Sequence, residues 1–221
     1  MSTETIEQPK VKESEGLLSK RRKKFLTDPL NDDNPITVQV LGICSALAIT
    51  AQMQPTLVMC ISVIAVVVLS NLTISLLRNL VPGRVRIIVQ LAVVATLVTL
   101  VNEVLKAYFY DMYKVLSVFV GLIITNCIIM GRLEAFAMGN KPYDSVLDGL
   151  GSGFGYAWII LLVAFFRELL GSGALFGFNV FEAVGIEKFP TVGLMVTPVG
   201  AFIILGLIIW VQRSKTGYVE H

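Results

Sequence analysis

Two of the three cysteines, Cys44 and Cys127, lie in two similar apolar stretches and are the residues best suited to chemistry. Each has a helix-weakening neighbour, Gly42 beside the first and Thr125-Asn126 before the second. A cysteine thiolate is a metal ligand as well as a packing side chain. A polar, thiol-bearing motif that occurs twice in a very apolar chain therefore indicates a role beyond packing.

The number of thiols limits what such a site could hold. Two thiolates are too few for a closed zinc or iron–sulfur centre, which takes four ligands. If Cys44 and Cys127 bind a metal, a second subunit must supply the remaining ligands. The alternative is that both cysteines pack as small apolar side chains at helix breaks. Cys60 lies in a continuous apolar stretch with no helix breaker and fits the packing interpretation. His221, the one histidine, stands at the C-terminus, which excludes a histidine-based relay within the membrane.

The chain that must position these thiols is strongly apolar. Of its 221 residues, 55% are hydrophobic and 15% are charged, whereas soluble domains carry roughly 25% charged residues. Spanning a membrane takes about 20 residues. The pattern predicts an all-α, polytopic membrane protein with six transmembrane helices, of which the first and fourth, bearing Cys44 and Cys127, are short or broken. The six apolar segments are residues 36–50, 57–77, 85–105, 115–130, 149–166 and 194–211.

The two cysteine motifs also divide the chain into halves. We expect a polar, basic tail over residues 1–34 and a six-helix membrane domain over 35–221. Within that domain, repeats of three segments cover about 35–107 and 113–212, and a repeated unit of three spans must return inverted. Chance similarity between apolar helices is the alternative explanation.

The charged residues predict the orientation. All but four of the 18 Lys and Arg residues fall on the side of the N-terminus, which places both termini in the cytoplasm. The basic run at 20–24 is interpreted as part of a cytoplasmic tail that fixes orientation rather than as an arm for anionic lipid or RNA. No cleavable signal peptide is expected. The four exceptions are Lys106, Lys114, Arg167 and Lys188.

Three further groups of residues have two interpretations each. Arg167-Glu168, at the end of the fifth segment, could mark an ion path or anchor helix ends. Asn71, Thr73 and Ser75 could coordinate a cation or form hydrogen bonds between helices. The alternating glycines of residues 149–155 lack the Lys-Ser/Thr of a phosphate loop, so they favour close helix packing.

Longer motifs carry a resemblance to a known family. They include Leu-Gly-Ile-Cys-Ser-Ala-Leu-Ala at 41–48, Val-Arg-Ile-Ile-Val-Gln at 85–90 and Leu-Ser-Val-Phe-Val-Gly-Leu-Ile-Ile-Thr-Asn-Cys at 116–127. Over about residues 34–212 the chain resembles the D-subunit family of the sodium-translocating NADH:quinone oxidoreductase. The E subunit of the Rnf-type complex shares the cysteine motifs and is the alternative, but residues 85–90 read closer to the quinone reductase branch. Further matching motifs are Arg78-Asn79, Gly131-Arg132, Glu134-Ala-Phe-Ala137, Arg167-Glu-Leu169 and Gly171-Ser-Gly173.

The resemblance implies a component, inactive alone, of a six-subunit Na⁺-pumping complex in the bacterial inner membrane. In that family the homologous D and E subunits lie in opposite orientation and hold one [2Fe–2S] cluster between them. Each of the two contributes two cysteines, which match Cys44 and Cys127 here, whereas Cys60 falls outside both motifs. FMN, FAD, NADH and quinone are implied on the other subunits, with A, B, C and F among them. Membrane lipid is an expected contact, and nucleic acid is not.

Two other function classes compete with an electron-transfer component. One is an inverted-repeat ion or solute transporter, which should carry intramembrane charges or a polar cavity, whereas the charges here fall near segment ends. The other is a structural scaffold, which needs no paired cysteines at corresponding helix breaks. Iron content and an EPR signal of the purified complex would separate the three.

Overall fold

The computed structural model describes residues 34–108, 110–175, 178–179 and 193–216, together with Thr27 and Pro29. The predicted tail, residues 1–34, lies almost wholly outside the described residues. The described part is helical apart from a two-residue antiparallel pair, β1 (Ala174–Leu175) with β2 (Phe178–Asn179). The predicted helical fold class is therefore confirmed.

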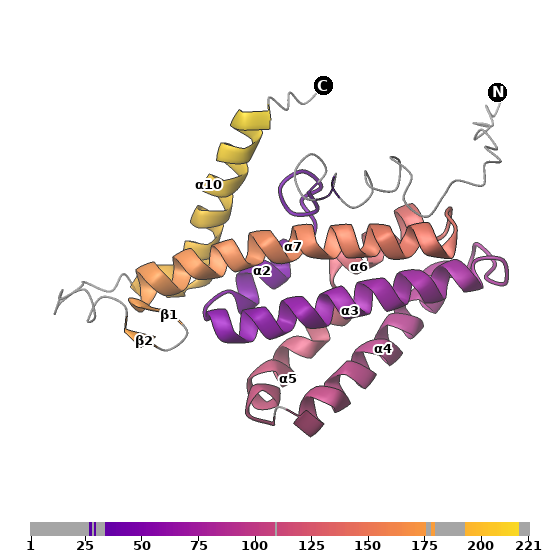
Figure 1. The fold of residues 1–221 in the computed structure, drawn as a ribbon, viewed down its shortest axis with the longest axis horizontal. Coiled ribbons are helices and arrows are strands. Elements are labelled where there is room, and N and C mark those ends of the chain that lie inside the picture. The colour runs from indigo at the N-terminus through magenta and orange to yellow at the C-terminus, as the bar shows by residue number, and fades with distance from the viewer. Residues whose placement is uncertain are drawn as a thin grey trace.

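Three described helices are long and apolar enough to cross a membrane (Figure 1). They are α3 (Met53–Leu77), α4 (Arg86–Tyr108) and α7 (Pro142–Gly171). At ~1.5 Å per residue even α4, with 23 residues, is about 34 Å long, against ~30 Å for the hydrocarbon layer. The chain is therefore a membrane protein with several spans, while the total of six spans stays a prediction.

The other three predicted segments are interrupted. The first contains only a turn and the short α2 (Ile43–Ile49), and the fourth is split after α5 (Tyr110–Ile124), as the sequence predicts. The sixth differs from the expected single segment because it breaks at Thr197, before Pro198. A proline ring cannot donate the backbone hydrogen bond of a helix interior. The remaining pieces are α6 (Cys127–Arg132), the π-helical turn η2 (Leu133–Ala137), α9 (Gly193–Val196) and α10 (Pro198–Thr216).

Helices α3 and α7 lie side by side and form the centre of the fold (Figure 1). Glycines on α7 allow this close approach. A Cβ atom at Gly149 would lie 2.9 Å from Asn71 Nδ2, and one at Gly153 would lie 3.0 Å from Ile64 Cγ1. The close-packing interpretation of these two glycines is confirmed, since a larger side chain would push the helices apart.

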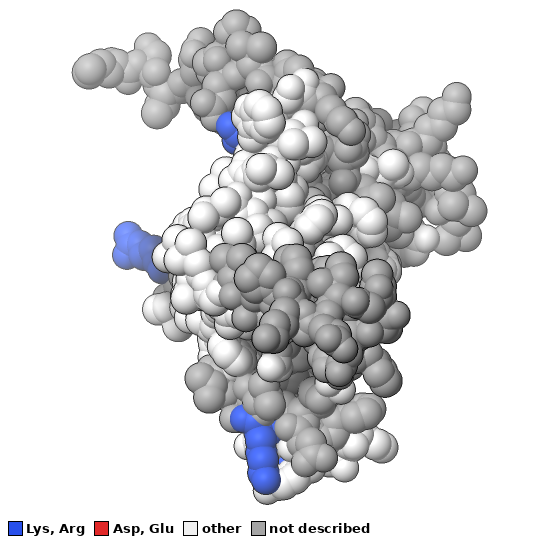
Figure 2. All heavy atoms as spheres, turned by 90° about the vertical axis from the view of Figure 1, so that its left-hand side faces the viewer, with Lys and Arg blue, Asp and Glu red and all other residues white. Residues whose placement is uncertain are grey.

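The outer surface of the helices suits lipid or a partner helix. Large apolar side chains such as Ile61, Leu100, Trp158 and Phe202 are exposed. Figure 2 shows one face on which Lys and Arg appear only at separate points, and no described Asp or Glu is visible there. A soluble domain would rarely leave so much contiguous apolar surface uncovered.

Candidate thiol site at two helix breaks

The first break precedes Cys44. Gly42 has a φ of 82°, in the left-handed region that glycine adopts without steric cost, and it is the N-cap of α2. Val40 also has a positive φ, of 57°, which is rare for a β-branched residue. The chain turns sharply here, so α2 begins only at Ile43 and Cys44 lies in its first turn.

The second break precedes Cys127. Helix α5 ends at Ile124, and Asn126 has extended backbone angles. The Asn126 side-chain oxygen accepts a hydrogen bond from Ile128 N at 3.3 Å, which caps the new helix. Helix α6 therefore starts at Cys127 itself, and the predicted helix-breaking role of Thr125-Asn126 is confirmed.

The fold brings the two breaks into direct contact. Asn126 Nδ2 lies 3.4 Å from Ser45 Oγ, so the residue before Cys127 bonds to the residue after Cys44. A Cβ at Gly131 would lie 3.0 Å from Leu41 Cδ1, which shows that the same two segments also pack through apolar atoms. The two cysteine-bearing segments are therefore neighbours in space, although 83 positions separate Cys44 from Cys127 in the sequence.

The contact lies at the middle of α7. Tyr156, midway along that helix, places its hydroxyl 2.7 Å from Ser45 Oγ and 3.3 Å from Asn126 Nδ2. All three side chains are buried. The two cysteine-bearing breaks thus meet midway along α7, a helix long and apolar enough to span a membrane.

The thiols themselves face outward from this buried contact. Cys44 and Cys127 are both exposed, whereas Cys60 is buried. No group of three or more His, Cys, Asp or Glu residues suited to a metal occurs among the described residues. Both thiols of the contacting segments are therefore open to whatever lies against the protein beside the two breaks.

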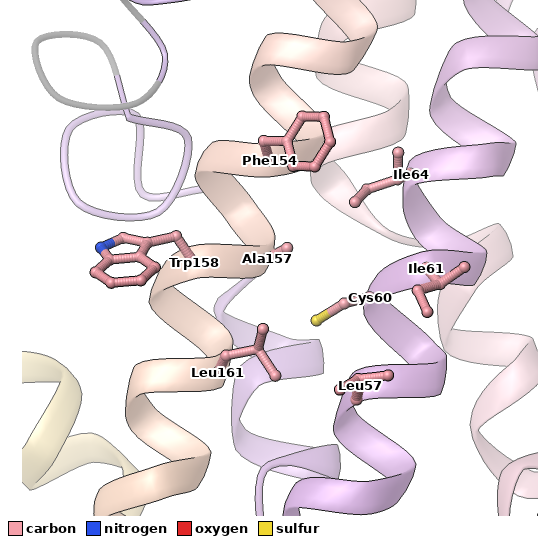
Figure 3. Close-up of a pocket in the computed structure, with 8 residues that line it drawn as sticks. All are labelled: Leu57, Cys60, Ile61, Ile64, Phe154, Ala157, Trp158 and Leu161. Atoms are coloured by element: carbon pink, nitrogen blue, oxygen red, sulfur yellow. The ribbon is translucent and has the colours of Figure 1, made fainter.

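Cys60 lies in a different environment. It is 3% exposed on α3 and points toward α7 across an apolar cavity of about 890 Å³ (Figure 3). The cavity is lined by apolar side chains such as Ile64, Phe154 and Leu161. A thiol in such surroundings behaves as a small apolar side chain, as the packing interpretation of Cys60 predicts.

Two arginines, Arg167 and Arg78, donate hydrogen bonds to chain segments that lie between helices. Arg167, 1% exposed, donates hydrogen bonds to Thr50 Oγ1 (2.6 Å) and Leu47 O (3.4 Å) at the end of α2. It also donates to three carbonyls at the break before α10, those of Met195, Val196 and Thr197, at 2.7–3.1 Å. At the opposite end of α3, Arg78 Nη1 donates to Asn140 O at 2.6 Å. Arg167 on α7 thus binds the segment that precedes α3, and Arg78 at the end of α3 binds the segment that precedes α7.

Glu168 and the polar residues of α3 act in the same way. Glu168 Oε2 accepts from Met53 N at 2.6 Å, at the first residue of α3. Asn71 and Ser75 donate to the carbonyls of Ser145 and Asn140, whereas exposed Thr73 bonds within its own helix. These contacts fit the anchoring and interhelical interpretations made from the sequence.

Sequence analysis missed the buried charge on α7. We placed the charges near segment ends, but α7 begins at Pro142, so Asp148 lies well inside the helix and is 1% exposed. It forms an ion pair with Arg132 at the end of α6. A second pair joins Arg86 to Glu134, which also accepts from Gln90 Nε2. We did not predict the pair of Asp148 with Arg132, because the expected start of the fifth segment at Gly149 placed Asp148 in a loop.

These features define an integral membrane protein in which interrupted helices bring two cysteine-bearing breaks into contact midway along α7. Residues 22–209 match the Rnf-Nqr family of membrane proteins, and the chain belongs to that family. The D subunit of the Na(+)-translocating NADH-quinone reductase of Aeromonas hydrophila subsp. hydrophila is 55% identical over 195 residues, 87% of this chain and 92% of the relative. The corresponding D subunit of Proteus mirabilis is 53% identical over 206 residues (92% and 98%), and that of Pasteurella multocida is 52% identical over 204 (91% and 98%).

Proposed function

We propose that this chain is the D subunit of a Na⁺-translocating NADH:quinone reductase in a bacterial inner membrane. The support is its similarity, over nearly the full length of both chains, to relatives that carry that name. The chain acts in an oxidoreductase complex with the homologous E subunit and with the A, B, C and F subunits. NADH, quinone, FMN and FAD bind to those other subunits.

Within that complex, Cys44 and Cys127 provide half of the ligands of a [2Fe–2S] cluster. The observation that carries this proposal is the pair of exposed thiols at two helix breaks that contact each other midway along α7. Such a cluster takes four ligands, so a homologous chain must supply two more. When bound, the cluster supplies a one-electron carrier. The protein's contribution is to hold two thiolates in fixed places and to enclose their charge away from lipid.

Loss of either thiol should remove the cluster. Cys44→Ala and Cys127→Ala are each expected to abolish this cluster, with the iron and acid-labile sulfide that belong to it, and to stop quinone reduction by the purified complex. NADH oxidation by the cytoplasmic flavin with an artificial acceptor should persist. Cys60→Ala is the matched control, because it removes a buried thiol outside the site and should leave iron content unchanged. Full iron occupancy in either site variant would contradict the proposal.

The missing ligands give a second test of the same proposal. This chain produced alone should bind no stable cluster, because half of the ligands are absent. Co-expression with the homologous E subunit should restore iron and sulfide in a stoichiometric complex. A stable cluster on the isolated chain would mean that its ligands come from elsewhere.

A further inference from the structure

The hydroxyl of Tyr156 contacts both cysteine-bearing breaks. It lies 2.7 Å from Ser45 Oγ, which follows Cys44, and 3.3 Å from Asn126 Nδ2, which precedes Cys127. Tyr156 belongs to neither break but to α7, the longest described helix. The two short helices thus share one attachment point on a rigid element.

The hydrogen bonds can be assigned directions. Ser45 Oγ donates its one proton to Gly42 O at 2.8 Å, so the phenol must donate to Ser45. The Asn126 oxygen accepts from Ile128 N, which turns the amide nitrogen toward Ser45 and Tyr156. Every donor then has an acceptor. A fully satisfied polar network at membrane depth fixes its members firmly, because no water is available to replace a lost bond.

The ring of Tyr156 adds a steric constraint. A Cβ atom at Gly42 would lie 2.9 Å from Tyr156 Cε2 and 3.5 Å from Asn126 Oδ1. The aromatic ring therefore occupies the space beside the first break, where a side chain on residue 42 would otherwise lie. Gly42, with its left-handed backbone, lets the chain run against this ring. Ring and hydroxyl have separable roles: the ring fills the break, and the hydroxyl connects it to the second one.

We propose that Tyr156 is a positioning residue whose phenol hydroxyl sets the relative placement of the Cys44 and Cys127 thiols. Each thiol lies in the first turn of a short helix, seven residues long for α2 and six for α6. Helices this short are not stable by themselves, so their positions depend on tertiary contacts. That the two thiols ligate a shared cluster rests on the proposed function, whereas their placement by Tyr156 does not.

The first experiment uses the chain in lipid nanodiscs without iron, in a Cys60→Ala background that leaves only the two thiols. Mild oxidation with copper–phenanthroline should form an intramolecular Cys44–Cys127 disulfide. Tyr156→Phe keeps the ring and removes the hydroxyl. We expect disulfide formation at least about fivefold slower, because the phenol loses its bonds to both Ser45 and Asn126 and the net loss of one bond already corresponds to that factor. Ser152→Ala, one turn earlier on α7, is the control, because the buried Ser152 Oγ has no hydrogen-bond partner among the described residues.

Ser45→Ala removes the bond between Ser45 and the phenol without altering the ring, and it also removes the bonds of Ser45 to Asn126 and to Gly42 O. It should slow the disulfide at least as much, and the effect of the double variant should fall short of the product of the two single effects, since one of the deleted contacts is shared. Unchanged disulfide formation in both single variants, or no disulfide in the parent protein, would overturn the proposal. If Tyr156→Phe fails to fold, an unchanged disulfide rate in Ser45→Ala would still overturn the proposal, because that variant also removes the bond between the phenol and the first break.

The assembled complex provides a readout that separates this inference from the proposed function. Tyr156→Phe should retain iron but shift the EPR signal and reduction potential of the cluster, because the ligands move relative to each other. A slower disulfide in a complex that never contains iron would uphold the positioning role and reject the cluster. Normal iron with an unchanged disulfide rate and unchanged EPR signal would reject the positioning role alone.

Discussion

At the scale of single residues, several buried polar side chains in this protein bind backbone groups that the broken helices leave free. Arg167 is the clearest case. Five hydrogen bonds run from its guanidinium to the end of α2 and to the break before α10. Free carbonyls are costly at membrane depth, where water cannot reach them. A buried arginine can serve several of them because its planar group carries five N–H donors.

Replacement of Arg167 should therefore destabilise the fold strongly. Arg167→Gln leaves several buried acceptors without a donor, at an expected cost of about 3 kcal/mol. Thermal unfolding of the purified protein in detergent would show a clearly lowered melting temperature. Arg78→Gln is the matched control, since Arg78 makes one described hydrogen bond, to Asn140 O, and should lower it less. Equal effects of the two changes would contradict the anchoring role of Arg167.

At the scale of elements, short helices are placed by what they contact rather than by their own stability. Helices α2 and α6 each begin at a break whose backbone conformation is locally encoded, by Gly42 in one case and by the Asn126 cap in the other. Beyond the breaks, α2 leads into α3 and α6 leads through η2 into α7. Because α3 and α7 are packed together, the starts of both short helices are held at the middle of the same helix pair.

Gly42 should tolerate no side chain, because the start of α2 is held closely against α7. Gly42→Ala forces an alanine into the left-handed region, which costs about 1–2 kcal/mol, and sets its Cβ against the Tyr156 ring. We expect a lower melting temperature and slower formation of the Cys44–Cys127 disulfide. Gly121→Ala is the control, because no described atom lies within 4 Å of a Cβ at that position on α5. A Gly42→Ala protein as stable as the Gly121→Ala protein would show that the break is not constrained.

At the scale of the whole molecule, Arg78 and Arg86 lie at the same end of the α3–α7 helix pair, close to the start of α7. Arg78 reaches Asn140, and Arg86 pairs with Glu134, so the end of α3, the start of α4 and the start of α7 lie together. The sequence assigned these residues to the cytoplasmic side by the positive-inside rule. Their clustering puts them at one end of the helix pair, and that this end faces the cytoplasm stays a prediction.

Reporter fusions test the orientation directly. Fusions after Lys141 and after His221 are expected to report a cytoplasmic location, and fusions after Asp111 and after Glu187 a periplasmic one. The expectation for 187 and 221 comes from the sequence alone, because both positions lie outside the described residues. A cytoplasmic signal at 187 would overturn the assignment of the fifth and sixth segments. Paired phosphatase and fluorescent-protein reporters at each position provide the control for expression.

The sequence by itself determined those features that depend on local composition. Long apolar runs predicted α3, α4 and α7, because a membrane span needs little more than length and apolar side chains. It also located both helix breaks, since Gly42 and Thr125-Asn126 weaken a helix wherever they occur. The boundary of α7 was misjudged by seven residues, because polar residues in its first turns resemble a loop, and Asp148 was misplaced as a result.

Only the tertiary structure decided how the breaks are joined. Ser45 and Asn126 are 81 residues apart, and Ser45 and Tyr156 are 111 apart. No local pattern distinguishes a tyrosine that connects two breaks from one that packs in a helix interface. The acceptors of Arg167 are likewise backbone carbonyls, which every residue carries and no sequence motif marks. Such contacts arise when α3 and α7 pack, because that packing selects which polar groups of distant segments meet away from water.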